Sequence, residues 1–185
     1  MKLAILDRIG ASSREGEDFL VPVEEWLPQV GLPEAIGQLT RAGWHIVLAS
    51  NQPGLGRGSF DVVDLNALHL RMQRVLHAAG ARVEAVFFCP HTAAEQCTCR
   101  KPAPGLLQQA AARYGAEPHE VWVVSQETNH LHAGRAMGAH TVWVQLDAAE
   151  PLPQDLGDTP VYRSWQAVAD ALAPDAQVPA PPVAA

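Results

Sequence analysis

Residues 83–114 read VEAVFFCPHTAAEQCTCRKPAPGLLQQAAARY, and this stretch is the most informative about the fold of the chain. It begins with an apolar run that predicts a buried strand over 83–88 and ends with a helix predicted over 105–114. Between them lie all three cysteines of the chain and the cation pair Arg100–Lys101. A strand, a loop and a helix in this order predict one unit of an α/β fold.

The loop itself predicts a metal site. Cys89, His91, Cys97 and Cys99 lie within one short segment, and thiolate and imidazole are the ligands that zinc prefers. Four such ligands close a tetrahedral site, so we predict a structural zinc that folds the loop. The clustering favours a metal over disulfides, and a disulfide from Cys89 to Cys97 or Cys99 is the alternative.

Strands and helices alternate along the rest of the chain. Strands are expected over 2–6, 44–49, 83–88, 121–124 and 141–145, with one more short strand at Tyr162. Helices are expected from Pro33 to Gly43 and over 61–79, 105–114, 130–137 and 165–172, and a turn-rich loop over 50–58. The order predicts a parallel central sheet with helices on both faces, in one domain over 1–173. The Pro/Ala-rich tail 174–185 is expected to be disordered.

Composition limits the partners. The chain has 185 residues, 48% hydrophobic and 18% charged, with a net charge of -7, which is typical of a soluble globular protein without a nucleic-acid footprint. No apolar run reaches transmembrane length, and Asp7 and Arg8 interrupt the first run too early for a secretory leader. Clustered cysteines suit a reducing compartment, so we expect a cytoplasmic protein.

Four chain segments should meet at one edge of the sheet, because ligands of parallel sheets bind beyond the carboxyl ends of the strands. They are 7–10, 50–58, the loop through Lys101, and 125–130. The Arg100–Lys101 pair is suited to holding a phosphate. The sequence therefore predicts an anion site at this edge.

These strand ends resemble the haloacid dehalogenase superfamily of phosphohydrolases. Within it, the chain is similar to the D-glycero-D-manno-heptose 1,7-bisphosphate phosphatases and their relatives, the histidinol-phosphate phosphatases. The motifs are Asp7-Arg8-x-Gly10, Ser50-Asn51-Gln52-x-Gly54-x-x-Arg57-Gly58 and the Cys-x-His…Cys-x-Cys-Arg-Lys-Pro element, and the resemblance covers roughly residues 3–145. It implies a three-layer, Rossmann-like α/β sandwich with a small zinc loop and no large cap.

The resemblance also implies roles. In this family one aspartate is the nucleophile, the aspartate two residues later is the general acid/base, and two further acidic groups hold magnesium. Asp7 matches the nucleophile, but Ile9 stands at the acid/base position, and Gln126 and His130 stand at the magnesium positions. The phosphate-holding residues implied by the family are retained, namely Ser50, Asn51, Arg57, Arg100 and Lys101.

Three of four acidic positions are thus replaced. Loss of a general acid/base commonly costs about 10² to 10⁴ in rate, and magnesium needs hard oxygen ligands. We therefore expect a pseudoenzyme that binds phosphate or a phosphosugar, with impaired or lost magnesium-dependent phosphatase activity. The alternatives are an active phosphatase with a metal rearranged onto Glu127 or His130, with His132 as a further ligand, and an interaction module with an unidentified protein partner.

Overall fold

A computed structural model of the protein describes residues 1–7, 9–11 and 19–174. Arg8, which belongs to the first motif, and the predicted disordered tail from residue 175 onward lie outside the described residues. The described chain forms a parallel six-stranded sheet in the order β3-β2-β1-β4-β5-β6. Its strands are β1 (Leu3–Leu6), β2 (His45–Asn51), β3 (Ala85–Cys89), β4 (Val121–Ser125), β5 (His140–Val144) and β6 (Val161–Tyr162).

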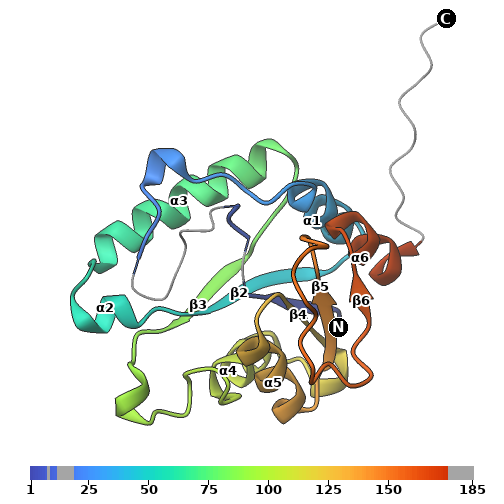
Figure 1. The fold of residues 1–185 in the computed structure, drawn as a ribbon. Coiled ribbons are helices and arrows are strands. Elements are labelled where there is room, and N and C mark those ends of the chain that lie inside the picture. Colours follow the sequence, from blue (N-terminus) through green and yellow to red (C-terminus); the bar gives the residue numbers. More distant parts are fainter. Residues whose placement is uncertain (8, 12–18, 175–185) are drawn as a thin grey trace, which may run out of the picture.

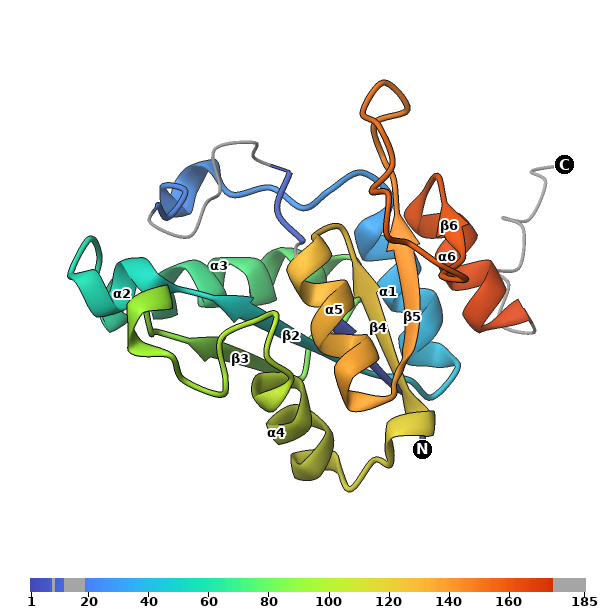
Figure 2. The ribbon, with the colours of Figure 1, turned by 60° about the horizontal axis from the view of Figure 1, so that its bottom comes forward.

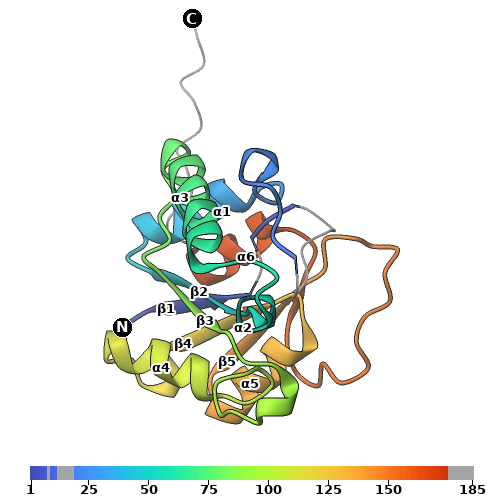
Figure 3. The ribbon, with the colours of Figure 1, turned by 90° about the vertical axis from the view of Figure 1, so that its left-hand side faces the viewer.

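Helices cover both faces of this sheet, as predicted. They are α1 (Leu32–Arg41), α2 (Pro53–Arg57), α3 (Val62–Ala78), α4 (Gly105–Tyr114), α5 (Thr128–Met137) and α6 (Trp165–Leu172). Figures 1 and 3 show α1, α3 and α6 on one face and α4 and α5 on the other. The result is a three-layer α/β sandwich, which confirms the predicted fold class. None of the helices in the described part of the chain is long and apolar enough to cross a membrane.

The central strand β1 shows why the sheet is buried. Its side chains alternate between the two faces. Ala4 and Leu6 join the core beneath α1, α3 and α6, whereas Leu3 and Ile5 join the core beneath α4 and α5. A strand that is apolar on both faces requires a helical layer on each side, which explains the unbroken apolar run at the start of the sequence.

The prediction of an irregular loop over 50–58 is wrong in part, because this stretch contains the short helix α2. Pro53 lies in its first turn, where proline presets the backbone angle that a helix needs. Gly58 follows its last residue in the left-handed conformation that favours glycine. A Cβ atom at Gly56 would lie only 2.3 Å from the carbonyl oxygen of Pro90, so glycine allows α2 to approach the cysteine loop. Figure 2 shows α2 beside this loop.

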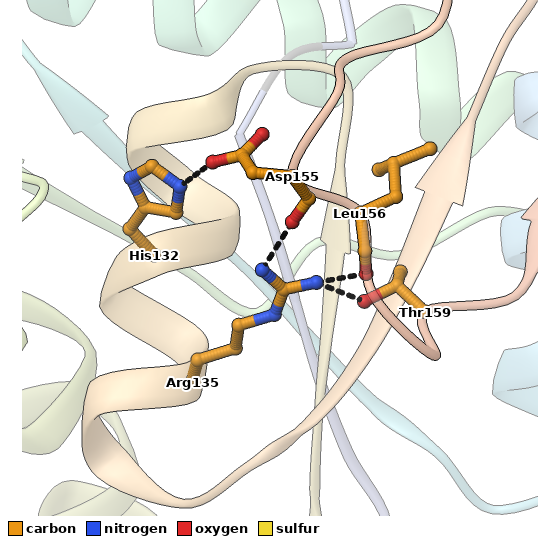
Figure 4. Close-up of polar contacts among 5 residues, drawn as sticks. All are labelled: His132, Arg135, Asp155, Leu156 and Thr159. Atoms are coloured by element: carbon orange, nitrogen blue, oxygen red, sulfur yellow. Dashed lines mark hydrogen bonds and ion pairs between the residues drawn. The ribbon is translucent and has the colours of Figure 1, made fainter.

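A set of polar contacts joins α5 to the long loop between β5 and β6 (Figure 4). The guanidinium group of Arg135 donates hydrogen bonds to the carbonyl oxygens of Asp155 and Leu156 and to the hydroxyl of Thr159. The imidazole of His132 contacts the carboxylate of Asp155. This contact lowers the pKa of Asp155. His132 thus contacts the loop between β5 and β6.

Candidate functional site

A cavity of about 570 Å³ lies at the carboxyl ends of the central strands. Asp7, which follows β1, lines it together with Ser50 and Asn51 at the end of β2. Lys101 and Gln126 reach it from the cysteine loop and from the segment before α5. The structure therefore brings together side chains from all four segments that the sequence places at this edge.

Asp7 is anchored to the segment that leads into α5. Its side chain is almost fully buried, and its Oδ2 atom accepts hydrogen bonds from the backbone N–H groups of Gln126 and Glu127, at 2.8 and 3.0 Å. Backbone donors stabilise a carboxylate in its ionised form. The contacts hold the carboxyl group of Asp7 in the cavity lining, beside the start of α5.

Lys101 is the cation of the cavity, and Asn51 fixes its backbone. The amide of Asn51 accepts a hydrogen bond from the N–H of Lys101 at 3.0 Å and donates one to its carbonyl oxygen at 3.1 Å. The Lys101 side chain is only 2% exposed, and its Nζ atom donates to the carbonyl oxygen of Ala49 at 2.9 Å. It also lies 3.2 Å from Nδ1 of His130. These two contacts, to a carbonyl oxygen and to an imidazole, fix the position of the ammonium group.

His130, at one of the replaced magnesium positions, is fully buried. Its Nε2 atom lies 3.2 Å from the carbonyl oxygen of Ile5. Burial, together with the nearby charge of Lys101, lowers the pKa of His130 well below its usual value. The spacing of the buried residues in α5, with Ala133 and Met137 on the same face, is the sequence signal for this inward orientation.

Ile9 and Gln126, the other two replaced positions, both line the cavity. Ile9 is buried and apolar, so it has no proton to transfer. The side-chain amide of Gln126 donates to Oε1 of Gln29 at 2.9 Å, and the indole N–H of Trp165 donates to the same oxygen at 2.8 Å. Sequence reasoning missed Gln29, since its role depends on residues far apart in the chain.

Arg57 and Arg100, the two arginines predicted to hold phosphate, do not line the described cavity as Lys101 does. Arg57 is exposed in the last turn of α2, and Arg100 is half-buried and donates to the carbonyl oxygen of His91 at 3.3 Å. Neither belongs to the described lining of the cavity, so a phosphate contact by either residue remains a prediction.

The four predicted zinc ligands lie together in the loop after β3. The ligand atoms of Cys89, His91, Cys97 and Cys99 all lie within 4.8 Å of one another, and the three sulfur atoms are 3.2–3.6 Å apart. A tetrahedral site with Zn–S bonds near 2.3 Å has sulfur–sulfur edges of about 3.7 Å. The cysteines are free thiols, which disfavours the disulfide alternative.

The cluster also has the polarity of a metal site. The backbone N–H of Arg100 donates to the sulfur of Cys97 at 3.3 Å, a contact that supports a thiolate. Burial and the hydrogen bond to Cys99 raise the pKa of the Cys89 thiol to about 12. The donor set of three sulfur atoms and one imidazole is a combination that zinc prefers, so the residues fit zinc.

Comparison with known proteins places this geometry in a class. Residues 98–173 match the family model described as HAD-hydrolase-like. The crystal structure of D,D-heptose 1,7-bisphosphate phosphatase from B. bronchiseptica, complexed with magnesium and phosphate, is 39% identical with a TM-score of 0.79. The alignment covers 93% of this chain and 98% of that one. The fold is therefore that of the haloacid dehalogenase superfamily.

Sequence relatives narrow the assignment. A D-glycero-beta-D-manno-heptose-1,7-bisphosphate 7-phosphatase from Pseudomonas aeruginosa is 35% identical over 175 residues, covering 92% of this chain and 97% of the relative. The protein of the same name from Neisseria meningitidis is 41% identical over 138 residues, covering 75% and 74%. The chain belongs to the heptose 1,7-bisphosphate phosphatase family, as the resemblance of its motifs predicts.

Proposed function

We propose that this chain binds the phosphoryl group of a phosphorylated small molecule, such as a sugar phosphate, without magnesium, and that it hydrolyses the ester weakly or not at all. The observation that carries this proposal is the contact between Lys101 and His130. His130 stands at a family magnesium position, yet one of its ring nitrogens faces Lys101 and the other faces the carbonyl oxygen of Ile5. A histidine held in this way has no ring nitrogen available for a metal ion.

The anion-binding side of the cavity supports the same proposal. The ammonium group of Lys101 is held in place by the carbonyl oxygen of Ala49 and by His130, and Lys101, Ser50 and Asn51 line the same cavity. In a site shielded from water, a fixed cation and neighbouring donors attract a phosphate more strongly than they would at the surface.

The metal-binding side of the cavity supports the loss of catalysis. Magnesium takes hard oxygen ligands in near-octahedral geometry, usually with carboxylates. Here Ile9 is apolar, and the amide of Gln126 is tied to Gln29. The nucleophile position, Asp7, is retained. The described site thus keeps its nucleophile but lacks an acid/base group and a normal metal site. Such a site is better suited to binding a phosphoryl group than to hydrolysing its ester.

A working phosphatase with a rearranged metal site is the second candidate, and Glu127 favours it. Glu127 lines the cavity, and its backbone N–H donates to the carboxylate of Asp7 at 3.0 Å. The two residues bring two carboxylates to one cavity, which a cation could use. The alternative with His130 as metal ligand is disfavoured by the hydrogen bonds of both its ring nitrogens.

Phosphate release from D,D-heptose 1,7-bisphosphate separates the two candidates. The assay compares magnesium, manganese and zinc for the wild type, for Glu127→Gln and for Glu24→Gln, a matched change at another acidic residue that does not belong to the described lining. We expect release close to background with every metal. Metal-dependent release that Glu127→Gln abolishes and Glu24→Gln preserves would establish the second candidate instead.

We further propose that Cys89, His91, Cys97 and Cys99 hold a structural zinc ion. The close approach of their ligand atoms supports this assignment, and a reducing compartment such as the cytoplasm would keep the thiols available. The zinc would fix the loop that carries Arg100 and Lys101, so its effect on the cavity is structural.

A further inference from the structure

The cavity is much larger than a phosphate ion. Its volume of about 570 Å³ falls in the range of about 300–1,000 Å³ that is typical of sites for organic ligands. The phosphoryl group lies, under the proposed function, beside Lys101. Most of the remaining space must then be filled by the organic part of the ligand, and the walls of that space indicate its chemistry.

The charged side chains of the cavity come from other parts of the fold than most of its apolar ones. The charged residues of the described lining are Asp7 after β1, Lys101 in the loop between β3 and α4, and Glu127 at the start of α5. A second set of lining residues is apolar and comes from the segment before α1, from α3 and from β3, and we call it the apolar wall: Ile9, Val21, Trp26, Leu68, Met72 and Val86. Within the described lining, the charged side chains and the apolar wall thus come largely from different segments of the chain.

The apolar wall is continuous with the hydrophobic core. Val21, Trp26 and Met72 belong to the core cluster between the sheet and the helices α1, α3 and α6. Figure 1 shows the chain around residues 20–26, in blue, beside α3 on this face of the sheet. The cavity is therefore bordered on this side by the core beneath α3.

The polar residue that α3 contributes to the lining carries no charge near neutral pH. His69 lines the cavity, and burial lowers its pKa below the usual value. A hydroxyl group placed against the apolar wall would lose its hydrogen bonds to water and gain few in return. Such an unpaired buried polar group costs about 1–3 kcal/mol in proteins.

We propose that the organic part of the ligand presents an apolar face, aromatic or aliphatic, which packs against the apolar wall while the phosphoryl group lies beside Lys101. This inference rests on the proposed function. The ligand would then differ from the heptose bisphosphate for which the relatives are named, because every carbon atom of that sugar carries an oxygen. Apolar surface, rather than a set of hydroxyl groups, then supplies the selectivity of the site.

Calorimetric titration with three probes tests the inference. Zinc-loaded protein in magnesium-free buffer is titrated with inorganic phosphate, glucose 1-phosphate and phenyl phosphate. We expect phenyl phosphate to bind at least about tenfold more tightly than inorganic phosphate, and glucose 1-phosphate to gain no more than about threefold. Tighter binding of glucose 1-phosphate than of phenyl phosphate, or equal binding of phenyl and inorganic phosphate, would overturn the inference and leave the proposed function standing. Binding by none of the three would contradict both.

A matched pair of variants tests whether the apolar wall causes the preference for phenyl phosphate. Val86→Thr adds one hydroxyl to the apolar wall at nearly constant shape, and Val63→Thr makes the same change at a residue that is 69% exposed on α3 and outside the described lining. Val86→Thr should lower the ratio of phenyl phosphate to inorganic phosphate affinity by at least about threefold, and Val63→Thr should leave it unchanged. Phe19→Ser, at the more exposed rim of the same cavity, is a second test. An unchanged ratio in both Val86→Thr and Phe19→Ser would contradict the placement of the ligand.

Discussion

The ammonium nitrogen of Lys101 lies 3.2 Å from Nδ1 of His130, and both side chains are almost completely buried. On the other side of the ring, Nε2 faces the carbonyl oxygen of Ile5. An ammonium group only donates hydrogen bonds and a carbonyl oxygen only accepts them. His130 therefore carries its proton on Nε2 and is neutral, and it contacts the ammonium group of Lys101 through Nδ1.

This neutral histidine predicts a pH dependence of stability. Burial and the charge of Lys101 lower the pKa of His130 in the folded state, whereas the unfolded chain takes up a proton near pH 6.5. The unfolded state then binds more protons, so stability is present above about pH 6.5 and is lost as the pH falls from there toward the folded pKa. Between about pH 7.5 and 5.5 the wild type should lose about 1 kcal/mol more unfolding free energy than His130→Asn, as measured by urea denaturation.

His77→Asn provides the control for this experiment, because His77 is exposed on α3. It should keep the pH dependence of the wild type. If His130→Asn and the wild type lose stability in parallel over this range, His130 is not the buried neutral group described above.

The cysteine loop predicts a measurable metal content. Purified protein should hold about one zinc ion per chain by elemental analysis, since four ligand atoms close a tetrahedral site. Cys97→Ser should reduce this content by more than half and lower the free energy of unfolding by about 2 kcal/mol or more, because zinc binding contributes directly to folding. Thr98→Ser, at the neighbouring residue, should change neither value. A wild type that takes up no zinc, or a Cys97→Ser variant that retains it, would contradict the site.

The contacts of Arg135 predict a local change in dynamics. Replacing Arg135 with alanine removes donors to the carbonyl oxygens of Asp155 and Leu156. We expect faster hydrogen exchange in the loop over 147–158 and a loss of about 1–2 kcal/mol of unfolding free energy. Arg113→Ala, an exposed arginine in the last turn of α4, is the control. Unchanged exchange in the loop would mean that these hydrogen bonds do not hold it.

Restoring the acidic residues should restore chemistry. The triple variant Ile9→Asp, Gln126→Asp and His130→Asp returns an acid/base group and two metal carboxylates to a cavity that still contains Asp7 and Lys101. We expect magnesium-dependent phosphate release from heptose bisphosphate to rise by about 10² or more. The same three positions changed to asparagine give an uncharged control of matched shape. A folded acidic variant no faster than this control would show that the cavity has diverged beyond these three residues.

Much of the fold follows from local sequence, and the features that do not follow from it depend on contacts between distant segments. The helix predicted over 165–172 has the predicted bounds, with the hydroxyl of Ser164 accepting a hydrogen bond from its first turn. The helix α2 was missed because glycines dominate it, and contact with the loop at Pro90 favours it. The location of the cavity could be predicted because the carboxyl ends of parallel strands lie at one edge of the sheet. The apolar wall and the bond of Gln126 to Gln29 depend on contacts between distant segments, which no local pattern encodes.

The most direct test of the central claim is a calorimetric titration of the zinc-loaded protein with inorganic phosphate, with and without millimolar magnesium, for the wild type and Lys101→Met. We predict a dissociation constant that magnesium changes by less than about twofold, and a loss of at least about tenfold in affinity in Lys101→Met. Phosphate binding that requires magnesium, or that is as tight in Lys101→Met as in the wild type, would contradict a phosphoryl site that depends on this lysine instead of a metal.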